Sequence, residues 1–504
     1  MKTRAQKEEF NSSPIHLFNL ISNIEQQFPV DSLESEDGTK IWNLLRILIY
    51  FYLQKKTEGT KKKKNFFLKK MVYILWESIK PLRLPRKQVE FCGFSGTESR
   101  KLLGNFFYDI YMDPLYDILG GDYYVFEWTT PLGYRQNYTK NIYSKNYVPI
   151  HIPLVSKPSL RLVLYKLIKK SFCCLKSDNC LGEIIAFVCR RTAISEKEFS
   201  KYIYDSLEIF FIMKDFFYHI LKKMCPKAIF LRCGYGRFHM ALAQACRELN
   251  IPCIELQHGI ITKNHVGYVK KTYSKNRDCL PEYILTYGNF FTDIIKKGTL
   301  FKLDRIITVG FPYLNEVINS KKRLNKKFQS YISNFSINLF ITSQWTVKNK
   351  IKKFVIDLSN EIDNSGKNIC IVFKPHPRDT EDYSSLASYN NIFVVDKFED
   401  PYEIFKVVHI HSTAYSTCGI EALSFGVPNI FINIEEFSKE MFHLIDNKSS
   451  FIVASAKEYL DKLDSIISNY SVIKNNAIKK SIEYFKPGAL NNIETFLNKI
   501  LIKL

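Results

Sequence analysis

The sequence predicts an α/β protein that contains two Rossmann-like, doubly wound parallel sheets, with an added N-terminal helical region. Two series of short apolar runs, one before and one after the segment NSKKRLNKKFQS (319–330), alternate with amphipathic helical patterns. Strands separated by helices of this length form right-handed crossovers in parallel sheets. The chain has 504 residues, which is more than a single hydrophobic core usually contains.

The domain boundaries are expected where the pattern along the chain changes. We expect a basic helical region at 1–85, a first Rossmann-like domain at 86–318 with a basic helical insertion at about 138–224, a second at 331–475, and a C-terminal helix at 476–504. The polar stretch at 319–330 is the best linker candidate. Ligands of doubly wound sheets bind at the carboxyl ends of the strands, so the two domains are expected to face a common cleft.

The elements of the first domain are expected in this order. A strand at Val89–Cys92 is followed by a loop rich in Gly, Ser and Thr and then by a charged amphipathic helix. The run DYYVFEW (122–128) predicts a strand that ends near the carboxylate of Glu127. Four further strands are predicted in AIFLRCG, IPCIELQHG, EYILTYG and RIITVGFP, and RFHMALAQACREL predicts the helix between the first two.

The second domain has the same alternation of predicted strands and helices. Strands are predicted in INLFITSQ, NICIVFKPHP, NIFVVD, VVHIHSTAY and VPNIFIN, with a helix that ends near Asn364 and another that begins near Cys418. Both halves of the chain therefore predict the same type of sheet.

The charge balance points to acidic partners. The formal net charge is +22, with 46% hydrophobic and 24% charged residues. Such an excess attracts nucleic acid, acidic membrane surfaces or phosphorylated substrates, and the composition excludes a disordered chain. No nucleic-acid-binding module is recognisable, so no nucleic-acid partner is expected.

The twelve cysteines and the N-terminal segment predict a cytoplasmic protein. The cysteines are scattered, mostly in apolar runs, and lack paired zinc-ligand spacing, so we expect reduced thiols. MKTRAQKEEFNSS has no apolar region typical of a secretory signal. The run WNLLRILIYFYL (42–53) contains Arg46 and is too short to span a bilayer, so it predicts a buried or interfacial helix. The run KKKK (61–64) is typical of a solvated loop, and contact with acidic lipid headgroups is the alternative.

The loop after IPCIEL carries the first group of candidate site residues. Gln257, His258 and Gly259 follow the strand directly, and Lys263 and His265 lie within the same loop. A glycine there permits a tight turn or a close approach of backbone to ligand. His258 is either a general base or a structural histidine, and Glu127 is the next candidate base.

A second loop, VFKPHPRD, carries three potential cations. Lys374, His376 and Arg378 alternate on a turn that two prolines stiffen. Such a set suits a phosphate or carboxylate group, although solvated charges on a surface turn give the same pattern.

A third loop combines hydroxyl groups with a helix start. A strand is expected to end at His411, and hydroxyl-bearing residues follow at Ser412, Thr413, Ser416 and Thr417. Helix N-termini offer free N–H groups to phosphates, so these residues predict donor-phosphate binding, and ordinary helix capping is the alternative. Glu421 could accept hydrogen bonds from ribose hydroxyls. In TVGFPYLNE, Gly310 is interpreted mainly as a hinge that lines the donor site.

Taken together, these motifs resemble those of GT-B glycosyltransferases of bacterial capsule and surface-polysaccharide biosynthesis. The order HG…K, G-x-P and K-x-H-P is similar to that of CDP-glycerol glycerophosphotransferases, and the K-P-H-P loop and the hydroxyl-rich loop resemble those of capsular Kdo- and sialyltransferases. The resemblance covers about residues 89–433. It implies that His258 is the proposed general base, that Lys374 and His376 contact the donor phosphate, and that Ser416, Thr417 and Glu421 contact hydroxyls and ribose.

The departures from these families shape the expected function. Gln257 stands where the glycerophosphotransferases have tryptophan, and their Pro-Leu-Lys after HG is missing. The E-x₇-E signature of many retaining enzymes is also missing. We therefore expect an inverting glycosyltransferase, peripheral on the inner face of the cytoplasmic membrane, that moves a sugar from a nucleotide donor to a glycan or lipid-linked glycan. No metal and no cofactor are expected.

Three alternatives stay open. The chain could be a CDP-glycerol-type glycerophosphotransferase or a nucleotide-sugar 2-epimerase, both of which have similar phosphate contacts. It could also be a basic scaffold or nucleic-acid-binding protein, which would explain the charge but not the histidines at two strand ends.

Overall fold

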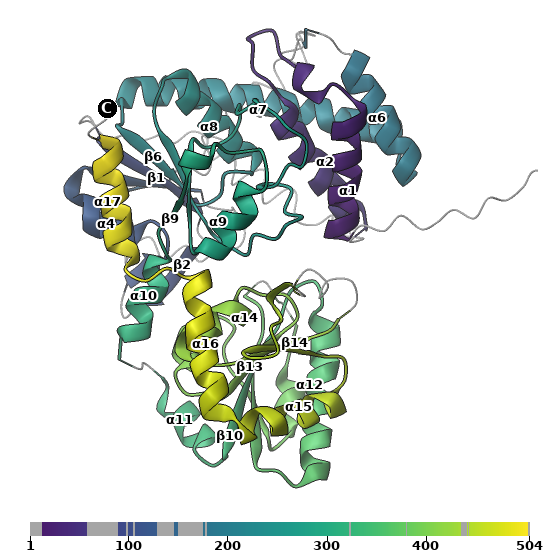
Figure 1. Cartoon of the computed structure of the whole chain (residues 1–504), viewed down its shortest axis with the longest axis vertical. Coiled ribbons are helices and arrows are strands. Elements are labelled where there is room, and N and C mark those ends of the chain that lie inside the picture. Colours follow the sequence, from purple (N-terminus) through teal and green to yellow (C-terminus); the bar gives the residue numbers. More distant parts are fainter. Residues whose placement is uncertain are drawn as a thin grey trace, which may run out of the picture. The chain divides into compact units, whose positions relative to one another are not determined.

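The structure is a computed structural model, and it describes residues 13–57, 89–96, 99–103, 106–128, 146–149, 175–176, 179–321, 324–377, 379, 381–434, 441 and 443–501. These residues form two compact units. Unit 1 contains the described residues of 1–286, 292–307 and 493–504, and unit 2 contains those of 287–291 and 308–492. Each unit is built around its own sheet (Figure 1).

Unit 1 contains a seven-stranded sheet with the order β5-β4-β1-β6-β7-β8-β9, and every pairing from β5 to β8 is parallel. The strands are β1 (Phe91–Gly96), β4 (Tyr123–Trp128), β5 (Tyr147–Pro149), β6 (Ala228–Leu231), β7 (Cys253–Leu256), β8 (Tyr283–Thr286) and β9 (Ile306–Thr308). β6 and β7 are buried along their whole length. Central strands of a parallel sheet are covered on both faces, which explains why their sequences are continuously apolar.

Unit 1 also contains helices, some of which pack on other helices. They are α1 (Pro14–Gln27), α2 (Trp42–Thr57), α4 (Asp113–Leu119), α6 (Asn179–Thr192), α7 (Glu196–Met224) and α8 (Arg237–Glu248), with short 3₁₀ turns at Val30–Ser32, Gly120–Asp122 and Leu303–Arg305. Two helices, α9 (Asn289–Lys296) and α17 (Ala489–Leu501), contain residues of both units. The long helix α7 packs against α2, α6 and α8, and Figure 1 shows α1 and α2 beside α6.

Unit 2 contains a six-stranded, entirely parallel sheet with the order β12-β11-β10-β13-β14-β15. Its strands are β10 (Ile337–Thr342), β11 (Ile369–Lys374), β12 (Ile392–Val394), β13 (Ile410–Thr413), β14 (Asn429–Ile432) and β15 (Ser450–Val453). Its helices are α10 (Pro312–Asn319), α11 (Lys326–Ile332), α12 (Lys348–Ser365), α13 (Pro401–Phe405), α14 (Cys418–Glu421), α15 (Ala456–Ser468) and α16 (Tyr470–Tyr484), with 3₁₀ turns at Ser384–Ser388 and Ala422–Phe425. The predicted α/β class with two parallel sheets is confirmed.

The segment that follows β1 differs from the prediction. β1 continues through Gly93 and Ser95 to Gly96, where a loop was expected. The expected amphipathic helix is absent from the described residues of that segment, which instead form an antiparallel pair, β2 (Arg100–Leu103) and β3 (Phe106–Asp109). Aromatic residues favour strands, and the run of aromatic side chains in NFFYDIY outweighs its helical spacing.

Two further segments differ in detail. Residues 147–149 of the expected helical insertion form β5, which pairs with β4. The polar stretch at 319–330 includes the first residues of α11, so it is not a continuous coil. The basic run at 61–64 lies outside the described residues, as do residues 150–174.

The apolar run at 42–53 forms α2, and its side chains are buried in unit 1. Trp42, Leu45 and Arg46 are each at most 1% exposed. The guanidinium of Arg46 pairs with Glu25 of α1 at 3.1 Å and donates hydrogen bonds to the carbonyls of Val266 and Val269 at 2.6 and 2.8 Å. α2 is therefore a buried helix that holds the loop after β7. Among the described residues, no helix is both long enough and apolar enough to span a bilayer.

Candidate active site

The carboxyl end of β7 presents His258, whose ring lies between two tyrosine hydroxyls. The Tyr235 hydroxyl is 3.1 Å from Nε2, and the Tyr268 hydroxyl is 3.5 Å from Nδ1. The backbone is also held, because the Tyr111 hydroxyl donates to the carbonyl oxygen of His258 at 3.1 Å. The ring is partly buried and fixed in position.

Tyr268 links Glu255 of β7 to His258 through its hydroxyl. The Tyr268 hydroxyl donates to its Oε1 at 2.5 Å, and the carboxyl group is fully buried. Burial raises the pKa of Glu255 to about 7, while the hydrogen bonds from Tyr268 and from the Gly234 backbone act in the opposite direction. When Glu255 is ionised, the single hydroxyl proton of Tyr268 is directed to the carboxylate, so its oxygen can accept from His258, which favours the tautomer with the imidazole proton on Nδ1.

The protonation of His258 follows from its surroundings. Burial lowers the pKa of His258 well below its usual range, and the positive charge of Arg232 acts in the same direction. The imidazole is therefore neutral near pH 7. With its proton on Nδ1, the Nε2 lone pair is the group that can accept a proton.

Two glycines, Gly234 and Gly259, lie next to Glu255 and His258, and their surroundings differ. A Cβ on Gly234 would lie 2.3 Å from Oε2 of Glu255, so only glycine lets the loop after β6 approach the buried carboxyl. A Cβ on Gly259 would meet no atom within 4 Å, and its φ is not in the left-handed region. The tight turn therefore does not require glycine at 259. Of the two roles that the sequence suggested for this glycine, close approach of the backbone to a ligand is the one that the geometry leaves open.

The other residues of the HG loop have distinct positions. Gln257 is buried, and its Nε2 donates to the carbonyl oxygen of Gly259 at 2.7 Å. Lys263 is exposed. The ring of His265 packs on Tyr268 with centroids 4.7 Å apart, and burial lowers its pKa to about 4.

Glu127, the second candidate base, lies in an ion-pair cluster. Its Oε1 accepts from Nε of Arg100 at 2.5 Å, and both side chains are almost fully buried. Arg100 also lies 3.6 Å from Asp113, where burial and the charge of Asp109 raise the pKa to about 8. A carboxylate paired with a guanidinium is a weaker proton acceptor, so the geometry favours His258 over Glu127 as the base.

In unit 2, Lys374 is the last residue of β11. Its side chain is 6% exposed, and Nζ donates to the carbonyl oxygen of Lys397 at 2.7 Å. His376 is partly exposed on the loop that follows. Arg378 lies outside the described residues. Lys374 therefore brings a fixed positive charge to the carboxyl end of this sheet.

The hydroxyl-rich segment divides into two parts. β13 extends beyond His411, so Ser412 and Thr413 lie within the strand and are fully buried. The Ser412 hydroxyl lies 2.7 Å from the Tyr459 hydroxyl, and the Thr413 hydroxyl donates to the carbonyl of Thr342 at 3.2 Å. Both hydroxyls are engaged inside unit 2.

Ser416 and Thr417 are more accessible and lie where α14 begins. The Ser416 hydroxyl accepts from the Cys418 backbone at 3.3 Å. Across the described ranges, no group accepts a hydrogen bond from the backbone N–H of Ser416 or Thr417. Glu421, the last residue of α14, is 8% exposed. The free amides are the groups of this segment best suited to an anion.

Sequence reasoning missed Gln344, which follows β10. Its Oε1 accepts from the backbone N–H groups of Ala414 and Tyr415 at 3.1 and 2.9 Å, which fixes the loop after β13. The polar ending of INLFITSQ was a signal for it, because polar residues at carboxyl ends of parallel strands lie near one another. Tyr235 and Tyr268 were missed as well; the glycine pair in CGYG was the signal for a loop closely packed against its neighbours.

Gly310 follows β9 and has a φ of +105°. A Cβ there would lie 2.2 Å from the carbonyl oxygen of Lys486. Within unit 2, the glycine thus permits close approach of the segment that follows α16. Within the described part of the chain, no group of three or more His, Cys, Asp or Glu side chains is arranged to hold a metal ion.

No protein-family model and no curated protein sequence matches this chain. Solved structures do match. A candidate UDP-N-acetylglucosamine 2-epimerase from Listeria monocytogenes aligns over 83% of this chain and 98% of its own, with 10% identity and a TM-score of 0.53. MnaA of S. aureus, determined with UDP, aligns over 82% of this chain and 98% of its own, with 10% identity and a TM-score of 0.52.

The wall teichoic acid polymerase TagF aligns over 92% of this chain and 97% of its own, with 12% identity and a TM-score of 0.47, which is too low to support an argument. At these identities the two stronger matches establish the fold alone. The chain has the GT-B type of fold, with two Rossmann-like units, as the order of its motifs predicts.

Proposed function

We propose that the protein is an inverting glycosyltransferase that moves a sugar from a nucleotide-activated donor to a hydroxyl of a glycan or lipid-linked glycan. The observation that carries this proposal is the neutral His258, whose Nδ1 faces a tyrosine bound to a buried carboxyl group. This arrangement leaves Nε2 with a lone pair at the carboxyl end of a parallel strand, where sheets of this type bind their ligands.

In the proposed reaction, the acceptor oxygen attacks the anomeric carbon of the donor. Nε2 of His258 takes the hydroxyl proton as the new carbon–oxygen bond forms and the bond to the donor phosphate breaks. The Tyr235 hydroxyl, 3.1 Å from Nε2, occupies the position that the acceptor hydroxyl takes. The bonding electrons leave with the nucleotide, so the leaving phosphate gains negative charge.

Unit 2 is proposed to bind that phosphate. Lys374 supplies a fixed positive charge, and the backbone N–H groups of Ser416 and Thr417 have no acceptor among the described residues. Charge and preorganised N–H donors stabilise a leaving phosphate without reorganisation. His376 lies on the loop after Lys374, Glu421 is proposed to contact the ribose, and UDP in the MnaA structure is consistent with a nucleotide ligand for this fold.

A surface glycan is the proposed acceptor, and we propose peripheral association with the inner face of the cytoplasmic membrane. The formal charge of +22 favours anionic lipid surfaces. Because α2 buries its apolar residues, the association is proposed to be electrostatic. Washing isolated membranes with concentrated salt should release the protein; retention that yields only to detergent would contradict this mode of binding.

A nucleotide-sugar 2-epimerase is the second candidate, favoured by the two matches with TM-scores above 0.5. An epimerase converts its nucleotide sugar without an acceptor. A glycerophosphotransferase would instead consume CDP-glycerol. Two observations therefore separate these functions: which donor is consumed, and whether it is converted when no acceptor is present.

The experiment is to incubate purified protein with individual nucleotide sugars and with CDP-glycerol, with and without lipid-linked glycan, and to follow the products by NMR. We expect a nucleotide to be released only when acceptor is present, and His258→Ala to lower kcat by roughly 10²–10⁴-fold with donor affinity unchanged. Epimerised donor without acceptor would replace the transferase proposal, and full activity of His258→Ala would remove His258 from the mechanism.

A further inference from the structure

A cavity of about 420 Å³ opens at the amino ends of β7 and β8, the edge of the unit 1 sheet opposite to His258. Its wall includes Cys253 and Tyr283, the first residues of these two strands, and Phe301 and Ile500 close the apolar side. A volume in this range is typical of sites for small molecules. The cavity belongs to unit 1 alone and is separate from the candidate active site.

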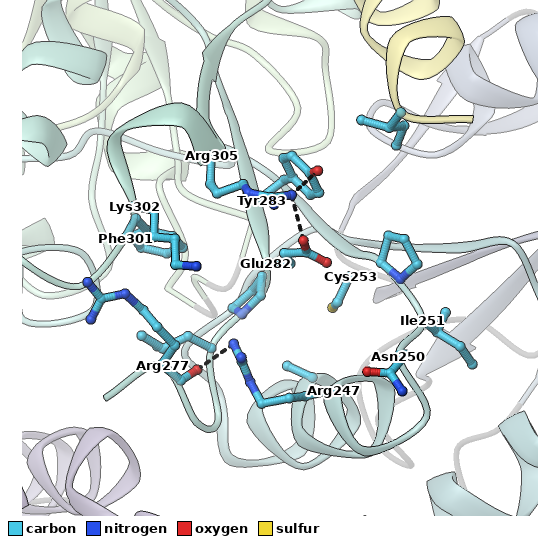
Figure 2. Close-up of a pocket in the computed structure, with 15 residues that line it drawn as sticks. Arg247, Asn250, Ile251, Cys253, Arg277, Glu282, Tyr283, Phe301, Lys302 and Arg305 are labelled. Atoms are coloured by element: carbon cyan, nitrogen blue, oxygen red, sulfur yellow. Dashed lines mark hydrogen bonds and ion pairs between the residues drawn. The ribbon is translucent and has the colours of Figure 1, made fainter. Parts of the chain in front are cut away.

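The polar side of this cavity is strongly basic. Arg247, Arg277, Lys302 and Arg305 line it, against a single carboxylate, Glu282. Figure 2 shows Arg247, Lys302 and Arg305 around a common space; Arg247 belongs to α8, and Lys302 and Arg305 lie before and at the end of the 3₁₀ turn that precedes β9. Four cations facing one anion leave a net formal charge of +3 in the lining.

The internal pairing of these cations is incomplete. Arg305 is paired, since its Nη1 lies 2.6 Å from Glu282 and its guanidinium stacks 4.5 Å from the ring of Tyr283. Arg247 has its nearest carboxylate, Asp278, only at 3.8 Å. Among the residues that the structure describes, none pairs with the ammonium group of Lys302.

Arg247 and Arg277 each have a hydrogen-bond donor that lacks an acceptor among the described residues. Nη2 of Arg247 donates to the carbonyl of Arg277 at 2.8 Å, and Nη1 of Arg277 donates to the carbonyls of Ser274 and Asn276. The Nε atoms of Arg247 and Arg277 are buried and have no hydrogen-bond acceptor in the described structure. A buried donor without an acceptor is costly, and an anion in the cavity would provide acceptors.

We propose that this cavity binds a phosphate-bearing ligand through Arg247, Arg277 and Lys302. Guanidinium groups match phosphate oxygens with two parallel hydrogen bonds, and an ammonium adds a point charge. The phosphate belongs either to a small soluble molecule or to an anionic lipid headgroup. The apolar wall at Phe301 and Ile500 accommodates the less polar part of either ligand.

The test is calorimetric titration of the full chain with inorganic pyrophosphate, for the parent and for single variants. Lys302→Gln and Arg247→Gln should each weaken binding by about tenfold, the effect of losing one charge-assisted hydrogen bond. Lys201→Gln is the matched control, because Lys201 is exposed on α7 and makes the same change in charge outside the cavity. Circular dichroism and thermal unfolding of each variant establish that it is folded.

A further variant, Glu282→Gln, is expected to increase the affinity for pyrophosphate. Glu282→Gln releases Arg305 from its ion pair and removes the only carboxylate of the lining, so pyrophosphate should bind more tightly than to the parent. Damage to the fold would not produce a gain. Lys374→Ala separates this cavity from unit 2: pyrophosphate binding that is lost in Lys374→Ala but unchanged in Lys302→Gln, Arg247→Gln and Glu282→Gln would overturn the proposal.

The two sources of phosphate are distinguished by flotation with vesicles of phosphatidylcholine, with and without phosphatidylglycerol. Binding to the anionic vesicles that is weakened in Lys302→Gln and Arg247→Gln, but not in Lys201→Gln, identifies a headgroup site. Binding of pyrophosphate alone with the same dependence identifies a soluble ligand. If neither probe responds to the cavity variants, the proposal is wrong.

Discussion

At the scale of single residues, the two ring nitrogens of His258 face different hydroxyls. Tyr268 lies on the Nδ1 side and is bound to Glu255, whereas Tyr235 lies on the Nε2 side. The two tyrosines are therefore expected to differ in function, although both contact the same ring. In the proposed mechanism, Tyr268 positions the proton of the imidazole, and the Tyr235 hydroxyl occupies the place of the acceptor hydroxyl.

Substituting each tyrosine by phenylalanine tests this difference. Tyr268→Phe should lower kcat by about tenfold or more, because Nδ1–H loses its acceptor and the favoured tautomer is no longer held. Tyr235→Phe should retain most of kcat, because Nε2 keeps its lone pair. The pH–rate profile should shift for Tyr268→Phe alone; equal losses with unchanged profiles would indicate that both tyrosines are merely structural.

The raised pKa of Glu255 predicts how stability depends on pH. The pKa of Glu255 is about 7 in the folded chain, whereas the unfolded chain has the ordinary value of 4.5. As the pH rises, the unfolded state therefore releases this proton first. The contribution of Glu255 to the free energy of unfolding therefore falls between about pH 4.5 and about pH 7, by up to about 3 kcal/mol. Urea unfolding of Glu255→Gln across this range should show a weaker fall than the parent; parallel curves would mean that Glu255 ionises normally.

Sequence reasoning at this scale identified residues with distinctive chemistry but not their partners. His258, Lys374 and Ser416 follow predicted strands, and position along a strand is readable from apolar patterning. Ser412 and Thr413 were expected in a loop and lie inside β13, because a hydroxyl can be buried wherever it finds a partner such as Tyr459. Contacts between residues distant in sequence, such as Tyr235 with His258, leave no local pattern.

At the scale of elements, α2 does more than pack against α1, α7 and α8. Arg46 connects this helix to Glu25 of α1 and to the backbone carbonyls of Val266 and Val269 in the loop that carries His258. The N-terminal helices thereby fix the position of the HG loop. This gives the added helical region a structural role that its apolar pattern alone did not reveal.

Removing Arg46 should be costly for this reason. Arg46→Met removes the cation that pairs with the buried carboxylate of Glu25 and the donor of the Val266 and Val269 carbonyls, so we expect a loss of roughly 3–5 kcal/mol in the free energy of unfolding. Lys56 also lies on α2, and Lys56→Met, which breaks the exposed pair with Glu198 of α7, should cost less than about 1 kcal/mol. Chemical denaturation compares the two, and a small, equal effect would show that Arg46 does not hold the loop.

The strands were predicted well and the short connections were not. β6, β7, β10 and β11 are continuous apolar runs bounded by polar residues, and such runs identify buried strands. The hairpin β2–β3 was read as a helix, since short apolar segments have no decisive period. β15 was not predicted, because SFIV is brief and follows a polar segment.

At the scale of the whole molecule, the chain consists of two parallel-sheet units with different chemistry at the carboxyl ends of their strands. Unit 1 holds a neutral histidine supported by tyrosine and a carboxyl group, and unit 2 holds a buried lysine and free backbone amides. This division of an acceptor-activating and a phosphate-binding unit is the central claim. The fold type and the two sheets were predictable from the alternation of patterns, whereas the identity of the nucleotide depends on contacts that no sequence pattern encodes.

The most direct test is calorimetric titration of the parent, Lys374→Ala, His258→Ala and Lys353→Ala with UDP, CDP, CMP, GDP and dTDP. Lys353 is an exposed lysine of α12 and serves as the matched control in unit 2. We predict that at least one nucleotide binds the parent, His258→Ala and Lys353→Ala equally, and binds Lys374→Ala about tenfold or more weakly. Failure of every nucleotide to bind the parent, or equal affinity in Lys374→Ala, would contradict the account.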